Sequence, residues 1–399
     1  MKPYEKPKFF EQIGRTMLAR LLERYQPEFA ADNVVVPKTT LEDPEYYASL
    51  SRLSARKPGF PENFVEALYS IEALSNAEGK SRLLRAVELA GLQIERIQTA
   101  TFADIAVQVL LADPALFAQK HDETRIAAMS TFEYHGCIEA VDRRLTFAAP
   151  TAAEVGRIKS DFDTWLGEER DGDERVTEIE AHEIDGEHCF LIRRGDSFLR
   201  VPTVEGNGFT VRHLRPARDV VVVYNPERDE LRIHAKTVRE KKKLRQLFGE
   251  RLFGNPDHFA LRKEFTLQPL RDEGPDVLSV TPGQGIDRIV LVELDVWSDD
   301  DFDACVKTTA LDLFAYAEAN QRDAIPRRGR LMMAGFEVYF TGNPKPRMVY
   351  VRDGNKLRLT RHCDAAAVHR WLAAHGFRSP EEPSVNRVTA YNGNTVGNN

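Results

Sequence analysis

The spacing of apolar residues changes near residues 169–175, and this change constrains the fold more than any other feature. Before it, apolar residues recur at helical intervals, as in FFEQIGRTMLARLLERY. After the acidic segment ERDGDER, apolar and polar residues alternate, as in VTEIEAHEI. A period of about 3.6 residues indicates helices that bury one stripe, and a period of about two indicates half-buried strands. The sequence therefore predicts an α+β protein with a helical N-terminal region and a mixed β-rich central domain.

Several expected helices carry capping signals. Pro61 suits the first turn of PENFVEALYSIEAL, and Gly91 suits the end of SRLLRAVELAGL. Thr101 and Thr151 each precede an acid by three positions, which is the spacing of a capping box. Asp113, followed by proline, predicts the start of a further helix. The apolar stripes of these helices indicate a packed core and require no cofactor.

The central region predicts a run of strands and one basic helix. A hairpin is expected around Asp185-Gly186, because Asp-Gly favours the tight turns that join antiparallel strands. Further strands are expected at SFLRVPTV, FTVRHLR, DVVVVY, ELRIHA, EFTLQPL and IDRIVLVELDVW. The segment from Val238 to Phe253 has a full apolar face beside its lysines, so we interpret it as an amphipathic helix packed on a sheet.

The last ordered part predicts a small αβββα module. SDDDFD opens an expected helix through CVKTTALDLFAYAEAN, and three strands and a helix follow, RLMMAGFEVYF, RMVYVRD, KLRLTRH and DAAAVHRWLAAHGF. From about residue 301 to 377 this order resembles the topology of double-stranded-RNA-binding domains. Those domains start their last helix with lysines, whereas this chain has Cys363 and Asp364 followed by alanines, so we assign no family. The predicted organisation is a helical domain (1–150), a β-rich α+β domain (151–298), the basic module (299–378) and a flexible tail (379–399).

Charge is distributed unevenly. The segment 326–378 has eleven Lys and Arg against three acids, a net +8, while the whole chain has a net −7, so the remainder carries −15. A basic segment on an acidic body indicates an anionic partner, or docking onto acidic protein. Arginines on neighbouring strands can hold phosphates by paired hydrogen bonds. We therefore predict a nucleic-acid-binding site formed by Lys345, Arg347, Arg352, Lys356, Arg358, Arg361 and Arg370.

A hairpin from Asp219 to Lys236 has the outline of a metal-dependent nuclease, with an acid opening one strand and a lysine ending the next. Such enzymes hold a divalent metal with carboxylates and use lysine to orient water or stabilise charge. Here His234 stands where a carboxylate is expected, and Arg232 adds positive charge. The same residue pattern also fits a hairpin with one wet face. The test is whether Asp219, Glu230, His234 and Lys236 converge.

The sequence gives little support for other kinds of functional site. His182, His188 and Cys189 lie on the expected hairpin, but their spacing fits ordinary strand residues better than a zinc site. The four cysteines form no CxxC pair, so we expect reduced thiols. No secretory signal and no apolar run of bilayer length is apparent, which predicts a cytoplasmic protein. We predict no cofactor and no bound metal.

These observations favour a non-catalytic, multi-domain, nucleic-acid-binding subunit of a larger bacterial assembly, acting on DNA or RNA through the phosphate backbone. The first alternative is a protein-interaction scaffold or adaptor whose basic tail docks an acidic partner. The second is a divergent metal-dependent nuclease.

Overall fold

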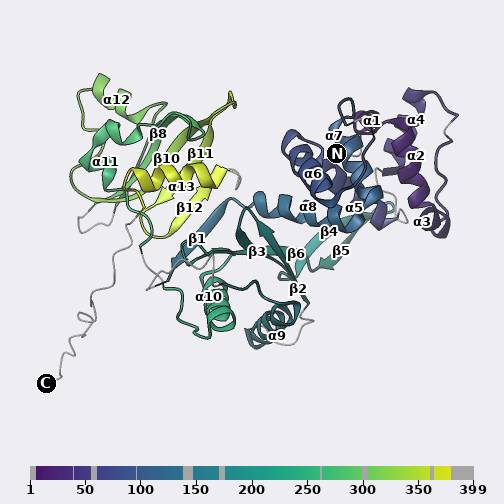
Figure 1. Ribbon diagram of the computed structural model, residues 1–399, viewed down its shortest axis with the longest axis horizontal. Helices are drawn as coiled ribbons and strands as arrows, with labels where there is room; N and C mark the ends of the chain where they lie inside the picture. Colours follow the sequence, from purple (N-terminus) through teal and green to yellow (C-terminus); the bar gives the residue numbers. More distant parts are fainter. Residues whose placement is uncertain are drawn as a thin grey trace. The chain divides into compact units, whose positions relative to one another are not determined.

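The computed structural model describes these residues (Figure 1): 6–38, 40–54, 61–95, 97–137, 147–169, 176–260, 263–298, 304–359 and 364–378. The chain forms two compact units, Met1–Arg125 and Ile126–Asn399. The first is helical where it is described, and the second is built on a large antiparallel sheet. The predicted mixed α+β class is confirmed. No helix within the described ranges has both the length and the apolar character needed to cross a membrane.

The helical unit packs around α7. Its helices are α1 (Pro7–Glu11), α2 (Arg15–Arg24), α3 (Gln26–Ala31), α4 (Asp43–Ser54), α5 (Glu62–Leu74), α6 (Ala77–Ala90), α7 (Phe102–Ala112) and α8 (Pro114–Ala127), of which α8 extends past Arg125. Buried residues on α7 include neighbours in sequence, such as Ile105, Ala106 and Val107, so this helix is buried on more than one side. That burial explains its nearly uninterrupted apolar sequence.

The expected first helix is interrupted at Gly14. The structure places α1 before it and α2 after it. The backbone N–H of Gly14 donates to Asp104 Oδ1 at 2.5 Å, and a β-carbon at Gly14 would lie 3.2 Å from that oxygen. Thr101 Oγ1 caps α7 by accepting from Asp104 N at 3.0 Å. Asp104, in the first turn of α7, therefore contacts the chain at Gly14, between α1 and α2.

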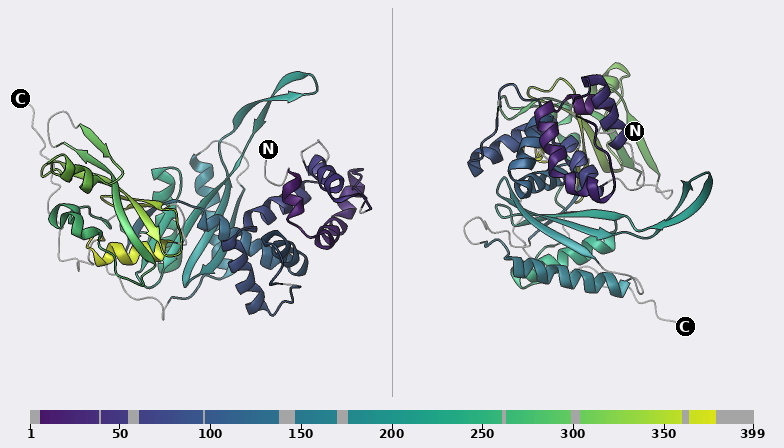
Figure 2. Two further views of the ribbon diagram at one scale, coloured as in Figure 1. Left: turned by 90° about the horizontal axis from the view of Figure 1, so that it is seen from above. Right: turned by 90° about the vertical axis from the view of Figure 1, so that its right-hand side faces the viewer.

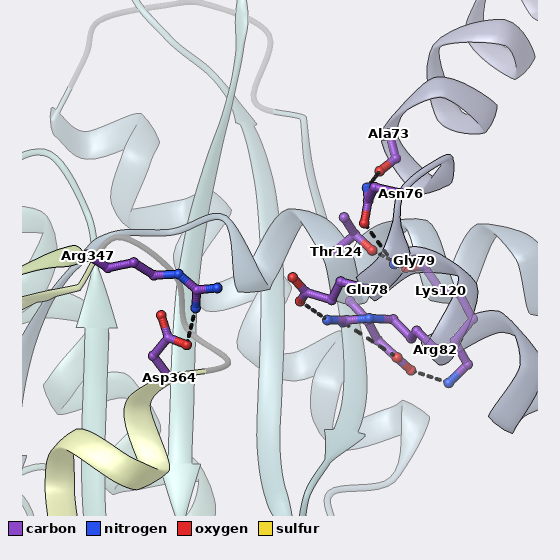
Figure 3. Close-up of polar contacts among 10 residues, drawn as sticks. Ala73, Asn76, Glu78, Gly79, Arg82, Lys120, Thr124, Arg347 and Asp364 are labelled. Atoms are coloured by element: carbon purple, nitrogen blue, oxygen red, sulfur yellow. Dashed lines mark hydrogen bonds and ion pairs between the residues drawn. The ribbon is translucent and has the colours of Figure 1, made fainter. Parts of the chain in front are cut away.

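Polar contacts also fix α6 (Figure 3). Asn76 Oδ1 accepts from Gly79 N at 2.9 Å, which caps the helix as short polar side chains do. Arg82 donates to Glu78 at 2.9 Å on the same helix face. Gly91 adopts φ +65° at the end of α6, so the predicted glycine stop is confirmed.

The second unit contains a sheet of ten described strands in the order β2-β3-β6-β7-β1-β12-β11-β10-β8-β9, with every ladder antiparallel. Their bounds are β1 (Thr131–Gly136), β2 (Thr177–Ile184), β3 (Glu187–Gly195), β6 (Ala217–Asn225), β7 (Glu230–His234), β8 (Ile286–Trp297), β9 (Cys305–Thr309), β10 (Arg330–Phe340), β11 (Arg347–Arg352) and β12 (Lys356–Leu359). Because β8 pairs with β10 and β12 with β1, strands on both sides of residue 298 share this sheet.

Strand β1 is shared by two half-sheets. The N-terminal half-sheet, β2, β3, β6 and β7, meets β1 at β7, and the C-terminal half-sheet, β8 to β12, meets it at β12. Each half-sheet ends in a helix, α10 (Val238–Phe253) after β7 and α13 (Ala365–Ala374) after β12. Glu133 lies opposite Ile233 in one ladder and opposite Lys356 in the other, so these three side chains share one face.

The two terminal helices cover opposite faces (Figure 1). Helix α10 packs Leu244 and Phe248 against the face of Ile233, together with α9 (Ala152–Glu169). Helix α13 packs Trp371 against the face of Leu357. In the N-terminal half-sheet, α10 covers one side of the sheet. In the C-terminal half-sheet, the same side faces away from α13. The predicted amphipathic helix from Val238 to Phe253 is confirmed over its whole length as α10.

Local signals predicted several other elements correctly. Thr151 and Glu154 form a reciprocal capping box at α9, with Thr151 N donating to Glu154 Oε2 at 2.6 Å and Glu154 N to Thr151 Oγ1 at 3.3 Å. Asp185 and Gly186 adopt φ +52° and +79° and join β2 to β3. Both residues therefore have the positive φ that the tight hairpin turn requires.

One predicted element is wrong and a second is correct only in part. The strand expected at EFTLQPL is absent from the described chain, where Phe265 forms isolated bridges and Pro269 opens the short helix α11 (Pro269–Asp272), followed by η2 (Gly274–Leu278). The helix expected through residues 305–320 is strand β9 and then α12 (Leu313–Ala319). The β-branched run after Cys305 pairs with β8, so sheet pairing overrides the acidic start signal. The predicted αβββα order is present as α12, β10, β11, β12 and α13, but strand β9 precedes it and its first helix is shorter than expected. Residues 299–303 and the predicted tail lie outside the described residues.

An arm projects from the second unit (Figure 2). It consists of β4 (Leu199–Glu205) and β5 (Gly208–Leu214), which pair with each other in a separate two-stranded sheet. Phe209, near its tip, is 89% exposed, and Val204 opposite it is 68% exposed. The predicted strands are confirmed, but their exposed apolar side chains were not anticipated.

Candidate nucleic-acid interface

The predicted basic site divides between the two faces of the C-terminal half-sheet. Along β12 the buried Leu357 and Leu359 face α13, while Lys356 and Arg358 face the other way. Arg352 lies opposite Lys356 in the β11–β12 ladder and shares its face. We call the face opposite α13 the open face, because its side chains on β10 and β11 are half-buried or exposed, apart from the position of Gly335.

Two tyrosines on the open face lie beneath arginines. The Arg358 guanidinium carbon is 5.3 Å from the ring centroid of Tyr350, its opposite residue in the ladder. The Arg288 guanidinium carbon is 4.2 Å from the ring centroid of Tyr339, which lies opposite it on β10. Such stacking holds a cation over an aromatic face while leaving its N–H groups available to other acceptors. The open face thus presents guanidinium groups stacked over aromatic rings.

Acids occupy the same face and neutralise some of its cations. Lys307 pairs with Glu293 at 2.5 Å, and Lys356 Nζ lies 3.8 Å from Glu133 Oε2. Within the described parts of the chain, no carboxylate lies within 4.0 Å of the guanidinium groups of Arg288, Arg352 and Arg358, which are all exposed. These three arginines are therefore the cations that an external anion would meet on this face.

The remaining predicted residues lie elsewhere. Arg347 is on the α13 face, where it forms an ion pair with Asp364 at the start of α13 (Figure 3). Arg370 is exposed on α13 and donates to the backbone oxygen of Gln284 at 3.3 Å. Lys345 is exposed between β10 and β11. Arg361 lies outside the described residues. The structure thus brings together Arg352, Lys356 and Arg358, but not the whole predicted set.

A cavity of about 830 Å³ lies on the α13 side of the sheet, between the β2–β3 turn, the β6–β7 turn and α13. Arg232, Arg378, Glu187 and Glu230 line it, and Arg370 lies at its α13 wall. Arg378 pairs with Glu230, and Arg232 with Glu187. Because each of these buried arginines has a carboxylate partner, the cavity floor combines fixed charges of both signs.

Tyr134 lies between these two ion pairs. Its hydroxyl is 3.1 Å from His369 Nε2, and the guanidinium carbons of Arg232 and Arg378 lie 5.9 Å and 5.8 Å from its ring centroid. Burial raises the pKa of the Tyr134 phenol above its ordinary value, although the two arginines oppose that shift. Burial also disfavours the charge of Arg232, but Glu187 reverses this and raises the pKa of Arg232. The phenol therefore stays neutral and the guanidinium charged.

The nuclease outline does not form a site. Glu230 lies opposite Asn225, whereas Asp219 is six residues farther along β6 and lies 3.7 Å from Arg193. Six strand residues span about 20 Å. His234 Nδ1 lies 2.8 Å from the backbone oxygen of Thr131, and Lys236 is 3.7 Å from Asp196. The four candidate side chains therefore do not converge around a metal.

The hairpin residues considered for zinc are also separated. His182 lies opposite Cys189 in the β2–β3 ladder, so these two share a face. His188 precedes Cys189 in the same strand and points to the other face, where its ring lies 4.8 Å from that of Phe147. Burial lowers the pKa of His188, which favours the neutral ring.

Sequence reasoning missed the aromatic part of the open face. The alternation in RMVYVRD places Tyr350 on the same side as Arg352, and this signal was available in the sequence. Arg288 and Tyr339 come from strands whose pairing was unknown, so no local signal could join them. The same limit applies to Cys137, Asp229 and His258, which the fold brings within 4.8 Å of one another.

No protein-family model matches the sequence, and no curated protein shows significant similarity to it.

Proposed function

We propose that this protein binds nucleic acid without catalysing its cleavage, and that the open face is the binding surface. The observation that supports the proposal is the placement of exposed Arg288, Arg352 and Arg358 beside Tyr339 and Tyr350 on one face. Single-stranded segments bind sheet faces of this kind because bases stack on aromatic rings while arginines contact phosphates. A duplex offers no free base to stack, so single-stranded RNA or DNA is the favoured ligand.

The charges on this face predict moderate affinity. Glu293 and Glu337 share the face with the arginines, so a long polyanion meets repulsion as well as attraction. Each base that stacks on a tyrosine contributes about 1–3 kcal/mol by alanine substitution. Each phosphate contact lowers the logarithm of affinity by about 0.7 per tenfold rise in salt for a single strand. Binding through three arginines should therefore show a shallow, measurable salt slope.

The test is fluorescence anisotropy of full-length protein with labelled single-stranded RNA, single-stranded DNA and duplex, at several salt concentrations. Arg352→Glu with Arg358→Glu should abolish binding at low salt, and Tyr350→Ala should weaken it about 5- to 150-fold, the equivalent of one stacked base. Arg370→Glu with Lys345→Glu is the matched control, because both side chains are exposed outside the open face. Absence of salt-sensitive binding by folded protein, or an equal loss in the control, would contradict the proposal.

A second candidate function is protein docking through the arm. Phe209, Val204 and Val211 extend along one face of the β4–β5 ribbon, and an isolated hairpin of this kind is only marginally stable in water. A covering protein would supply the missing contacts. This function corresponds to the scaffold alternative, except that the partner would contact the β4–β5 arm and not the basic C-terminal segment. Co-purification of a specific partner from the native host should be lost on Phe209→Ser and retained with Arg352→Glu and Arg358→Glu.

A further inference from the structure

Three residues with metal-ligating side chains meet at the end of β1. Cys137 follows β1, Asp229 lies in the turn between β6 and β7, and His258 follows α10. The β1–β7 ladder positions the first two, because Cys137 N donates to the backbone oxygen of Asp229 at 3.1 Å. His258 is brought close by the loop after α10, whose Phe259 forms a bridge with Cys137. The sulfur, one ring nitrogen and one carboxylate oxygen all lie within 4.8 Å of one another.

The distances within this cluster are close to those of a tetrahedral metal site. Cys137 Sγ is 4.0 Å from His258 Nδ1, and His258 Nε2 is 3.0 Å from Asp229 Oδ1. Zinc bonds of about 2.3 Å to sulfur and about 2.0 Å to nitrogen place those two ligand atoms roughly 3.6 Å apart in a tetrahedron. The two measured contacts end at different nitrogens of His258, and only one of these nitrogens can bind the ion. Because the sulfur, one ring nitrogen and one carboxylate oxygen lie within 4.8 Å of one another, side-chain rotations can direct these three atoms at one point.

The surrounding residues hold two of the ligands in place. The His258 ring stacks on Phe253 with centroids 3.9 Å apart and planes 6° from parallel. Asp229 is fully buried at φ +46°, and Tyr224 Oη donates to its Oδ1 at 3.0 Å. Outer hydrogen bonds of this kind orient metal ligands and tune their affinity. Cys137 is also buried, so water does not compete freely for its sulfur.

We propose that Cys137, Asp229 and His258 bind a zinc ion that ties together the end of β1, the β6–β7 turn and the loop after α10. Thiolate, imidazole and carboxylate suit zinc, whereas magnesium and calcium prefer oxygen ligands alone. On binding, the Cys137 thiol releases its proton to solvent and the sulfur donates its electron pair to the metal. Because the ligands come from separate segments and two of them are buried, binding of the ion adds to folding stability. The three side chains leave the fourth position of the tetrahedron to water.

The experiment is a cobalt titration of full-length protein first stripped with chelator. Cobalt(II) replaces zinc in tetrahedral sites and gives visible d–d bands, with a thiolate-to-metal charge-transfer band where sulfur is bound. We expect both bands to saturate at equimolar cobalt and to disappear when zinc is added. Zinc should also raise the melting temperature of the wild-type chain.

Variants identify the ligands. Cys137→Ser should eliminate the charge-transfer band, and His258→Gln should weaken cobalt binding while the thiol remains. Cys189→Ser is the matched control, because it removes another buried thiol of the same unit that lies outside the cluster. Tyr224→Phe should weaken binding by about 10- to 100-fold, the usual effect of losing an outer hydrogen bond.

Two results would overturn the zinc site. One is a folded wild-type chain that gives no thiolate–cobalt band, or a band that persists in Cys137→Ser. The other is rapid, His258-dependent alkylation of Cys137 by iodoacetamide without cobalt binding, which would identify a reactive thiol–imidazole pair instead.

Discussion

Tyr350 lies directly opposite Gly335 in the β10–β11 ladder, and its ring occupies the space that a side chain at Gly335 would enter. A β-carbon there would lie 3.0 Å from the Tyr350 ring and 2.9 Å from Glu293 Cβ. The absence of a side chain at Gly335 therefore leaves room for the Tyr350 ring on the open face.

Gly335→Val should displace the Tyr350 ring and with it Arg358. We expect loss of the stacking contribution, about 1–3 kcal/mol of binding free energy, with a comparable overpacking cost in stability. Anisotropy and denaturant unfolding measure the two effects. Gly156→Ala in α9, where a β-carbon meets open space, is the control and should slightly stabilise the protein. Unchanged affinity in a folded Gly335→Val variant would exclude a role for the Tyr350 ring.

Glu133→Gln should strengthen nucleic-acid binding. Glu133 neutralises Lys241 at 3.1 Å and Lys356 at 3.8 Å, and only Lys356 belongs to the open face. Releasing Lys356 should improve binding by about 0.2–1 kcal/mol and steepen its salt dependence. Glu88→Gln, the same charge change at an exposed site in the helical unit, should leave both quantities unchanged. A weaker complex would show that Lys356 does not contact the ligand.

The stability of the second unit should fall in acid through Glu133. Burial tends to raise its pKa, but His135 and the Lys241 ammonium outweigh burial and hold it at about 2, against an ordinary 4.5. Because the folded pKa is the lower one, this stabilisation is complete above pH 4.5 and is lost as the pH falls toward 2. The shift corresponds to roughly 3 kcal/mol. Chemical unfolding of wild type and Glu133→Gln should therefore differ at neutral pH and converge in acid; a constant difference would contradict this assignment.

The buried pair Arg378–Glu230 should show strong coupling in a double-mutant cycle. Arg378→Met leaves the Glu230 carboxylate buried without its guanidinium, which typically costs about 3–5 kcal/mol. Glu230→Gln with Arg378→Met removes both charges and should cost clearly less than the sum of the single changes. Urea unfolding provides the free energies. Additive effects would show that the ion pair does not dominate the energetics of the cavity floor.

The sequence predicted elements whose signals are local. The Asp185-Gly186 turn, the Thr151 capping box and the glycine stop of α6 each depend on a few adjacent residues, and each is confirmed. Strand β9 was misread because its acidic, helix-like start was weighed without its partner β8. Strand β1 was missed for a related reason. TFEYHG is short, and both its neighbours lie far along the chain.

The candidate site was predictable to the extent that it follows strand alternation. Lys356 and Arg358 were placed together correctly on one face of their strand. Arg347 had been grouped with them, but its position on β11 directs it to the opposite face, where it meets Asp364. Alternation within one strand cannot give the register between strands, and the pairing of arginines with tyrosines depends on that register.

The position of β1 between the half-sheets has a consequence for synthesis. The ribosome makes this central strand before any other strand of the sheet, and it makes β7 well before β12. Until the C-terminal half-sheet has been synthesised, the edge of β1 that later pairs with β12 has unpaired backbone groups. Exposed edges of this kind recruit strands from other chains. The interval between synthesis of β7 and synthesis of β12 is therefore the stage at which this protein is most exposed to misassembly.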